Sequence, residues 1–169
     1  DQVIFGADIK RRYVGGGVTE DNHYLVISAA NSTYGNELYI QDLTQPNSPI
    51  ITIVDNFNSD NNIVENQGGK LFIETDLNAP NKRIVSVDVK NPKPENWKDV
   101  IPETENVLTL STGGGYFFAN YMKDAVSVVK QYDYEGKLIR EIKLPGLGTV
   151  NGFGGKKEEN TLYYSFTNY

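Results

Sequence analysis

Few residues of the types that carry out enzymatic chemistry occur in a usable pattern. The sequence has one histidine, His23, and no cysteine. A nucleophilic serine needs a neighbouring base, and the Gly-x-Ser-x-Gly turn that presents such a serine in many hydrolases does not occur. His23 ends the polar stretch TEDNH, which is typical of a solvated turn. We therefore predict no catalytic residue in this chain.

The segment DNFNSDNNIVE, residues 55–65, is the best candidate for a metal site. It is rich in carboxylate and amide oxygens, the ligands that Ca²⁺ prefers. The spacing of an EF-hand loop fails, because Phe57 stands at the third position and Asp60 at the sixth, where glycine is required. We expect a connection between strands built on Asx turns, with no metal and no other cofactor.

Two triple glycines, Gly15–Gly17 and Gly113–Gly115, invite comparison with phosphate-binding loops. Such loops lead into a helix or continue to Gly-Lys-Ser/Thr, and neither triple glycine does so. We expect the first on an inner strand, where neighbouring chains crowd and a missing side chain helps. The second has the composition of a hairpin turn.

A longer loop of small polar residues falls within SAANSTYGNEL, residues 28–38. Loops of this kind lie on the surface and often contact ligands, although an ordinary solvated loop has the same composition. The candidate cavity-facing residues in it are Asn31, Ser32, Thr33 and Tyr34.

These candidates are distributed over an internal repeat. Four apolar runs begin at Tyr24, Lys70, Tyr116 and Thr161, a spacing of 45 or 46 positions. A second series, ELYIQDL, RIVSVDV and VVKQYDY, repeats in step with the first. More polar runs and short β-rich runs complete each unit, with turns rich in Gly, Asn or Asp between them. Asp42, Asp88 and Asp133 recur in the second series, where a hairpin-turn role explains them most simply.

Four short strands repeating every 40–50 residues are the signature of a β-propeller blade. The first runs are apolar on consecutive residues, as strands packed on both faces should be, and no segment keeps a helical period. The predicted fold class is an all-β partial β-propeller with almost no helix; a β-sandwich with accidental spacing is the alternative. Within one domain, 1–169, the predicted blades are 13–55, 61–102 and 106–144, with part-blades 1–8 and 148–169.

Composition limits the partners. The net charge of −6 gives no reason to expect binding to nucleic acid or to an anionic membrane, and no apolar run approaches a membrane span. Without cysteine the compartment stays open between cytoplasm and periplasm for a soluble protein. The sequence begins on Asp1 and stops within the strand-like residues 163–169, so we expect a piece of a longer protein. Open blade edges would favour self-association.

Three segments, in order along the chain, resemble the propeller domain of the prolyl oligopeptidase family of serine peptidases. GGGVTEDNHYLVISAANSTYGNELYIQDL (15–43) is similar to the family's G-x-x-x-S-x-D-G-R-Y-L pattern followed by N-x-L-Y-x-x-D-L. NPKPENWKDVIPE (91–103) looks like its P…W…IPE blade segment. VNGFGGKKEENTLYYSFTNY (150–169) resembles its Y-x-F-T-S-F stretch.

The resemblance implies a seven-bladed propeller that covers an α/β-hydrolase domain and restricts access to it. That catalytic domain cleaves short peptides after proline with a Ser, Asp and His triad. None of the triad lies in this chain, so we expect the chain alone to be inactive. The loop matching 29–34 faces the cavity near the active site in the family. It holds a reactive cysteine in some members, where Ser32 or Thr33 stands here.

Two other functions stay open on the sequence. The chain could be a stand-alone propeller that binds a protein or a small ligand. A lectin-like propeller with one sugar or metal site per blade is a weaker alternative, because the recurrent aspartates follow strands as turn residues do.

Overall fold

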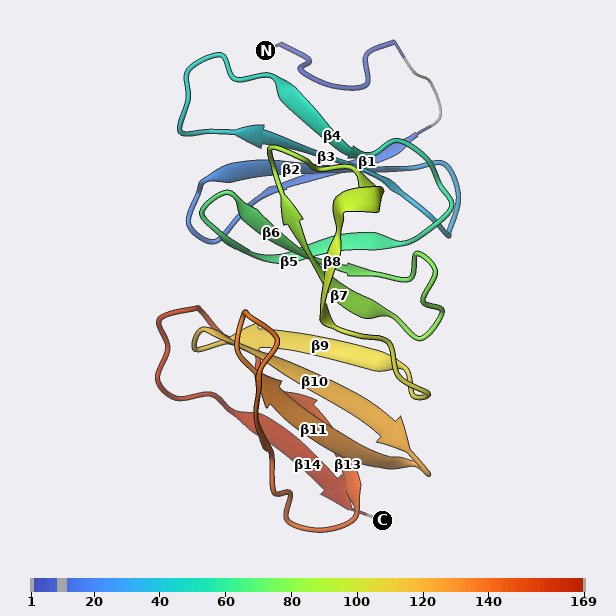
Figure 1. The fold of residues 1–169 in the computed structure, drawn as a ribbon, viewed down its shortest axis with the longest axis vertical. Coiled ribbons are helices and arrows are strands. Elements are labelled where there is room, and N and C mark those ends of the chain that lie inside the picture. Colours follow the sequence, from blue (N-terminus) through green and yellow to red (C-terminus); the bar gives the residue numbers. More distant parts are fainter. Residues whose placement is uncertain (1, 9–11, 169) are drawn as a thin grey trace. The chain divides into compact units, whose positions relative to one another are not determined.

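The structure of the protein, a computed structural model, describes residues 2–8 and 12–168 as short strands joined by turns and loops (Figure 1). Over these residues the one helix is a 3₁₀ turn, η1 (Pro94–Asn96), so the all-β class is confirmed. No helix of the described chain is long and apolar enough to cross a membrane. The chain divides into two compact units, which are described separately: Asp1–Leu77 with Ser86–Lys98, and Asn78–Val85 with Asp99–Tyr169.

The first sheet is an antiparallel meander in which the two middle strands are the most buried. Ile27, Leu38 and Ile40 are at most 4% exposed, whereas every residue of the first strand is exposed. The first triple glycine lies on this edge strand. The strands follow chain order: β1 (Tyr13–Val18), β2 (Tyr24–Ala30), β3 (Glu37–Asp42) and β4 (Ile50–Val54).

The second sheet has the same topology and spans the division between the units. Three consecutive residues of its second strand, Leu71, Phe72 and Ile73, are fully buried. This is the packing on both faces that consecutive apolar residues predict. The strands are β5 (Asn61–Gln67), β6 (Lys70–Thr75), β7 (Arg83–Asp88) and β8 (Lys98–Ile101).

The third sheet lies wholly in the second unit. Its outer strand is exposed at every residue, as its polar sequence predicts. Gly114 and Gly115 form the turn between its first two strands with φ of 59° and 79°, values that a two-residue hairpin turn of type I′ requires. The strands are β9 (Leu108–Gly113), β10 (Tyr116–Lys123), β11 (Val126–Tyr132) and β12 (Leu138–Glu141).

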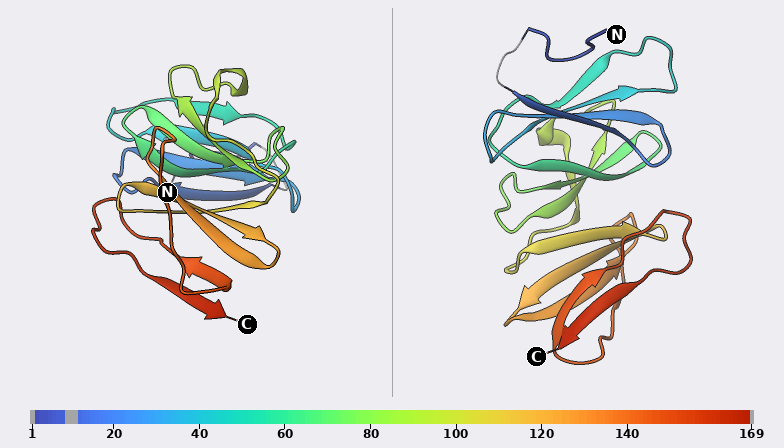
Figure 2. Two further views of the ribbon diagram at one scale, coloured as in Figure 1. Left: turned by 60° about the horizontal axis from the view of Figure 1, so that its bottom comes forward. Right: turned by 180° about the vertical axis from the view of Figure 1, so that it is seen from behind.

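A two-stranded antiparallel sheet follows, made of β13 (Gly148–Gly152) and β14 (Tyr164–Asn168), which lie side by side in Figure 2. The prediction that the second of these strands begins at Thr161 is wrong, as is the tight turn before it. Because β13 ends at Gly152, residues 161–163 have no strand to pair with. Leu162 instead packs against the core around Phe118 and Phe153.

The structure contains three four-stranded sheets, at 13–54, 61–101 and 108–141. The division of the chain into blades and part-blades, and the way in which the blades close into a propeller, stay predictions. Residues 2–8, expected as a strand of a preceding blade, contain no strand here, and residue 1 lies outside the described residues. A strand needs a partner for its backbone groups. In this segment Phe5 packs on the ring of Tyr39, with the ring centroids 4.8 Å apart.

Candidate functional site

The candidate loop, Asn31 to Tyr34, connects β2 to β3 and is exposed throughout. Tyr34 is 52% exposed, and its hydroxyl donates a hydrogen bond to the carbonyl oxygen of Asn58, 3.3 Å away. The four predicted residues therefore form one continuous polar surface in the first unit. Whether this surface faces a cavity stays a prediction.

The loop rests on a second loop, residues 55–60, which joins β4 to β5. The amide of Gly35 donates to Oδ1 of Asp60 at 2.8 Å, and the amide of Asn36 donates to the carbonyl of Ser59 at 3.0 Å. Gly35 has φ of +77°, and a Cβ there would overlap the backbone of Phe57. Glycine is therefore required at this position by both conformation and space.

A buried hydrogen-bond network links Asn36 and Asn61, in which each side chain bonds the backbone of the other residue. The side-chain nitrogen of Asn36 donates to Ser28 Oγ and to the carbonyl of Asn61, both at 3.0 Å. In return the amide of Asn61 donates to Oδ1 of Asn36 at 2.7 Å. The hydroxyl of Thr75 donates to Oδ1 of Asn61 at 2.7 Å. A satisfied polar network of this kind fixes geometry, so it holds the candidate loop in one position.

An ion pair lies at the start of β3, next to the loop. Arg12 donates to Oε1 of Glu37 at 2.8 Å, and the Glu37 side chain is 5% exposed. The guanidinium also lies 5.8 Å from the centre of the Phe57 ring, within cation–π range. Arg12 thus attaches the segment before β1 to the start of β3 and to the loop 55–60.

The electrostatics of the loop keep its phenol protonated. The nearby carboxylate of Asp76 is the largest cause that raises the pKa of Tyr34, through its hydrogen-bonding influence on the phenol; burial and the charges of Asp76 and Asp60 follow. Tyr34 is therefore a hydrogen-bond donor at neutral pH. With hydroxyls, an amide and a phenol, the loop can donate hydrogen bonds to polar groups and accept them.

His23 lies in the turn between β1 and β2, as predicted. Its Nε2 is 3.5 Å from Oδ1 of Asp42, and its ring stacks on Tyr24 with centroids 4.1 Å apart. Its backbone amide donates to Asp21. These contacts are those of a residue that stabilises a turn.

The three recurrent aspartates have the predicted turn role. Each accepts a hydrogen bond from the amide two residues later. Thr44 donates to Asp42 at 2.8 Å, Lys90 donates to Asp88 at 2.9 Å, and Glu135 donates to Asp133 at 3.0 Å. The repeat is thus a repeat of Asx turns.

The segment 55–65 also has the predicted Asx geometry. Oδ1 of Asn56 accepts a hydrogen bond from the amide of Asn58 at 3.1 Å. Its other side chains support the candidate loop, as described above. Sequence reasoning missed this support, although the Gly-Asn pair at 35–36 is a recognisable signal for a turn with positive φ.

Comparison with known proteins gives the chain its family. Residues 1–169 match the family described as prolyl oligopeptidase, N-terminal beta-propeller domain. The chain is 58% identical over 170 residues to a prolyl endopeptidase of Elizabethkingia miricola and 56% identical to that of Elizabethkingia meningoseptica. Each alignment covers 100% of this chain and 24% of the relative, so the chain spans about a quarter of its relatives' length.

Solved structures agree with this assignment. A structure from a study of two prolyl endopeptidases superposes with a TM-score of 0.82 at 25% identity, over 93% of this chain and 23% of the other. Prolyl oligopeptidase B of Galerina marginata superposes with a TM-score of 0.81 at 23% identity, over the same shares, and so supports the fold. The chain belongs to the prolyl oligopeptidase family and corresponds to part of its N-terminal β-propeller domain.

Proposed function

We propose that this chain is the substrate-gating β-propeller portion of a proline-specific serine endopeptidase that cleaves short peptides after proline. The observation that carries the proposal is the 58% identity to a prolyl endopeptidase along the whole chain. The chain aligns with 24% of that relative, so the proposal assigns the activity to a longer protein of which these residues would be one part.

The partner that the chemistry requires is an α/β-hydrolase domain in the same protein, which would supply the serine, aspartate and histidine. The single histidine of this chain is already engaged with Asp42, and no Gly-x-Ser-x-Gly turn is present. The chain alone is therefore expected to give no turnover above a blank with a proline-containing chromogenic peptide.

Within the gating role, the loop of Asn31 to Tyr34 is the part that would contact peptide substrate. Its exposure and its rigid support favour this role. Neither Ser32 nor Thr33 can react as a thiol, so a peptidase carrying this segment should not lose activity to thiol reagents through this loop.

The second unit contributes a groove that suits the rest of a propeller blade. A hollow of about 600 Å³ lies beside β14 and is lined by Phe118, Ile139, Ile142, Leu162 and Tyr164 among others. Two further strands added to β14 would cover these apolar side chains. This is the shape expected if the blade that begins at 148 is completed by more chain.

A chimaera tests the proposal. These 169 residues would replace the aligned segment of the Elizabethkingia miricola enzyme, and cleavage of a short proline peptide would be measured. We expect kcat/KM within about tenfold of the parent enzyme, since the two segments are 58% identical and most surface substitutions change stability by no more than about 0.5 kcal/mol. A folded chimaera without proline-specific cleavage would contradict the proposal.

The gating claim needs its own measurement. Cleavage after proline should be lost when the same sequence is presented in a folded protein, and it should be retained in a short peptide. A chimaera that cleaves both equally well would retain the peptidase function and contradict gating.

One observation favours a second candidate function, a self-associating binding module. The exposed edge strand β1 and the exposed Tyr163 (81% exposed) leave strand edges and an aromatic ring open to other chains. Light scattering that shows a stable monomer at high concentration would count against it.

A further inference from the structure

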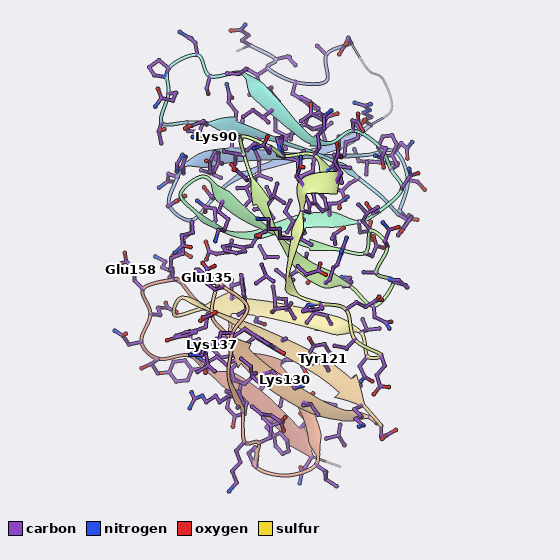
Figure 3. The ribbon with its side chains drawn as sticks, in the orientation of Figure 1. Lys90, Tyr121, Lys130, Glu135, Lys137 and Glu158 are labelled. Atoms are coloured by element: carbon purple, nitrogen blue, oxygen red, sulfur yellow. The ribbon has the colours of Figure 1, made fainter. Side chains whose placement is uncertain are left out.

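The second unit contains a hollow of about 380 Å³ beside the third sheet; the candidate loop belongs to the first unit. Pockets for small ligands begin near this size. Its walls come from β10, β11, β12 and the loop before β9. Figure 3 labels two of the lining residues, Tyr121 and Lys130. The lining residues that carry charge are two lysines and two glutamates: Lys123, Lys130, Glu105 and Glu141.

The strand register explains why these groups share one face. Tyr121 is paired with Val128 across β10 and β11, and Lys130 is paired with Glu141 across β11 and β12. Side chains directly opposite on antiparallel strands, and those two residues along, point to the same side. Tyr121, Lys130 and Glu141 therefore all lie on the face that bears the hollow.

The four charged side chains of the hollow form no salt bridges with one another among the described residues. Although Lys130 and Glu141 are cross-strand partners, no salt bridge joins them, and neither Lys123 nor Glu105 has one among the described residues. Thr104 and Asn106 close a small turn at the rim through a 2.9 Å hydrogen bond from the threonine hydroxyl to the asparagine carbonyl. The rim therefore offers positive and negative side chains together with neutral hydrogen-bonding groups.

One lining residue, Tyr121, is 5% exposed and carries a buried hydroxyl that lacks a hydrogen-bond partner among the described residues. Burial, with a smaller contribution from Tyr132, raises the pKa of Tyr121 to about 12, so the phenol stays protonated. A buried hydroxyl without a partner is unfavourable, and an acceptor brought by a ligand would relieve it.

We propose that this hollow binds a small zwitterion, a free amino acid or a di- or tripeptide with both termini uncapped. The carboxylate accepts hydrogen bonds from Tyr121 and the lysines, and the ammonium lies between Glu105 and Glu141. A simple anion would leave the two glutamates unmatched, and a simple cation would leave the lysines unmatched. This is a binding proposal only. It does not rest on the proposed peptidase function, since the hollow would bind the zwitterion without cleaving it.

The test is a titration of the 169-residue chain with Gly-Pro, followed by NMR shifts of the residues around Tyr121. The expected result is saturable binding by Gly-Pro and by free proline. Acetyl-Gly-Pro and Gly-Pro amide should each bind about tenfold or more weakly, since each loses one charge-assisted contact. Absence of saturation by Gly-Pro, or equal binding of the capped peptides, would overturn the proposal.

Variants of the lining residues, each compared with a control variant outside the hollow, test which side chains bind Gly-Pro. Lys130→Gln, Glu141→Gln and Tyr121→Phe should each weaken Gly-Pro binding roughly tenfold. The controls Lys137→Gln and Glu158→Gln change exposed residues outside the hollow and should leave binding unchanged (Figure 3). Far-UV circular dichroism would verify that every variant is folded. Equal effects of Lys130→Gln and Lys137→Gln would refute the assignment.

Discussion

At the scale of single residues, the candidate loop depends on positions that do not themselves face solvent. Gly35 is the clearest case. Gly35→Ala should destabilise the protein by roughly 1–3 kcal/mol from the positive φ alone, and by more because the backbone of Phe57 must move. Urea denaturation measures the loss. The matched control, Gly17→Ala, adds a methyl group with no atom within 4 Å and should change the free energy of unfolding by less than about 1 kcal/mol.

The asparagine network allows a second prediction. Asn36→Ala leaves buried groups of Asn61 without partners and should cost about 1–3 kcal/mol in urea denaturation. Asn31→Ala, at an exposed position of the same loop, should cost less than about 0.5 kcal/mol. Equal costs for the two variants would mean that the network does not support the loop.

The turn at Asp21 links stability to pH. Burial acts to raise the pKa of Asp21, but hydrogen bonds from Thr19, Asn66 and the His23 amide, with the nearby His23 charge, outweigh it and lower the pKa. A carboxyl group with a lowered folded-state pKa stabilises the protein above its unfolded pKa of about 3.9. That contribution is lost as the pH falls through the folded pKa.

Asp21→Asn tests this linkage. The variant should be less stable than the original protein at pH 7. The difference should begin to narrow below about pH 4, where Asp21 becomes protonated in the unfolded state, and should vanish only at the lower pH at which the folded state is also protonated. Urea midpoints measured from pH 7 to pH 3 give the comparison. A difference that stays constant over this range would show that the charge of Asp21 does not contribute.

At the scale of elements, the loop 153–163 is fixed to the β9–β10 hairpin. The amide of Gly114 donates to the carbonyl of Lys156 at 2.9 Å, and the amide of Gly155 donates to the carbonyl of Thr112 at 3.0 Å. A Cβ at Gly113 would come within 3.0 Å of Leu162. The Leu162 side chain therefore occupies space that is open only because residue 113 is glycine.

A double-mutant cycle measures that complementarity. Gly113→Ala should detach the loop, which increases hydrogen exchange at the amides of Gly114 and Gly155. Gly113→Ala combined with Leu162→Ala should recover part of the protection, with a coupling energy of about 0.5–3 kcal/mol. Additive effects would show that the two positions do not contact in solution.

Strand positions could be predicted because each depends on local pattern. Consecutive apolar residues such as Leu71 to Ile73 and the paired glycines at 114–115 specify a buried strand and a turn almost alone. The start of β14 could not be predicted in this way. It depends on where β13 ends and on the packing of Leu162, both of which are tertiary effects.

In the candidate site too, some features follow from local sequence and others depend on tertiary packing. The polar loop with Tyr34 could be predicted from its composition, and the turn aspartates from their spacing. The support by Asn36 and Asn61 could not, because those residues are 25 positions apart and meet only after two strands have folded. The hollow beside Tyr121 likewise depends on the register of three strands.

At the scale of the whole molecule, the four-stranded sheets and the family assignment identify part of an N-terminal β-propeller domain. We propose that these residues gate a proline-specific active site supplied elsewhere in the same protein. This claim concerns function in the longer chain and not the chemistry of the segment alone.

The chimaera with the Elizabethkingia miricola enzyme tests that claim most directly, with kcat/KM for a short proline peptide as the measured quantity. We predict retained cleavage after proline, within about tenfold of the parent. The separate 169-residue chain should give no turnover. A folded chimaera that does not cleave after proline, or turnover by the chain alone, would contradict the account.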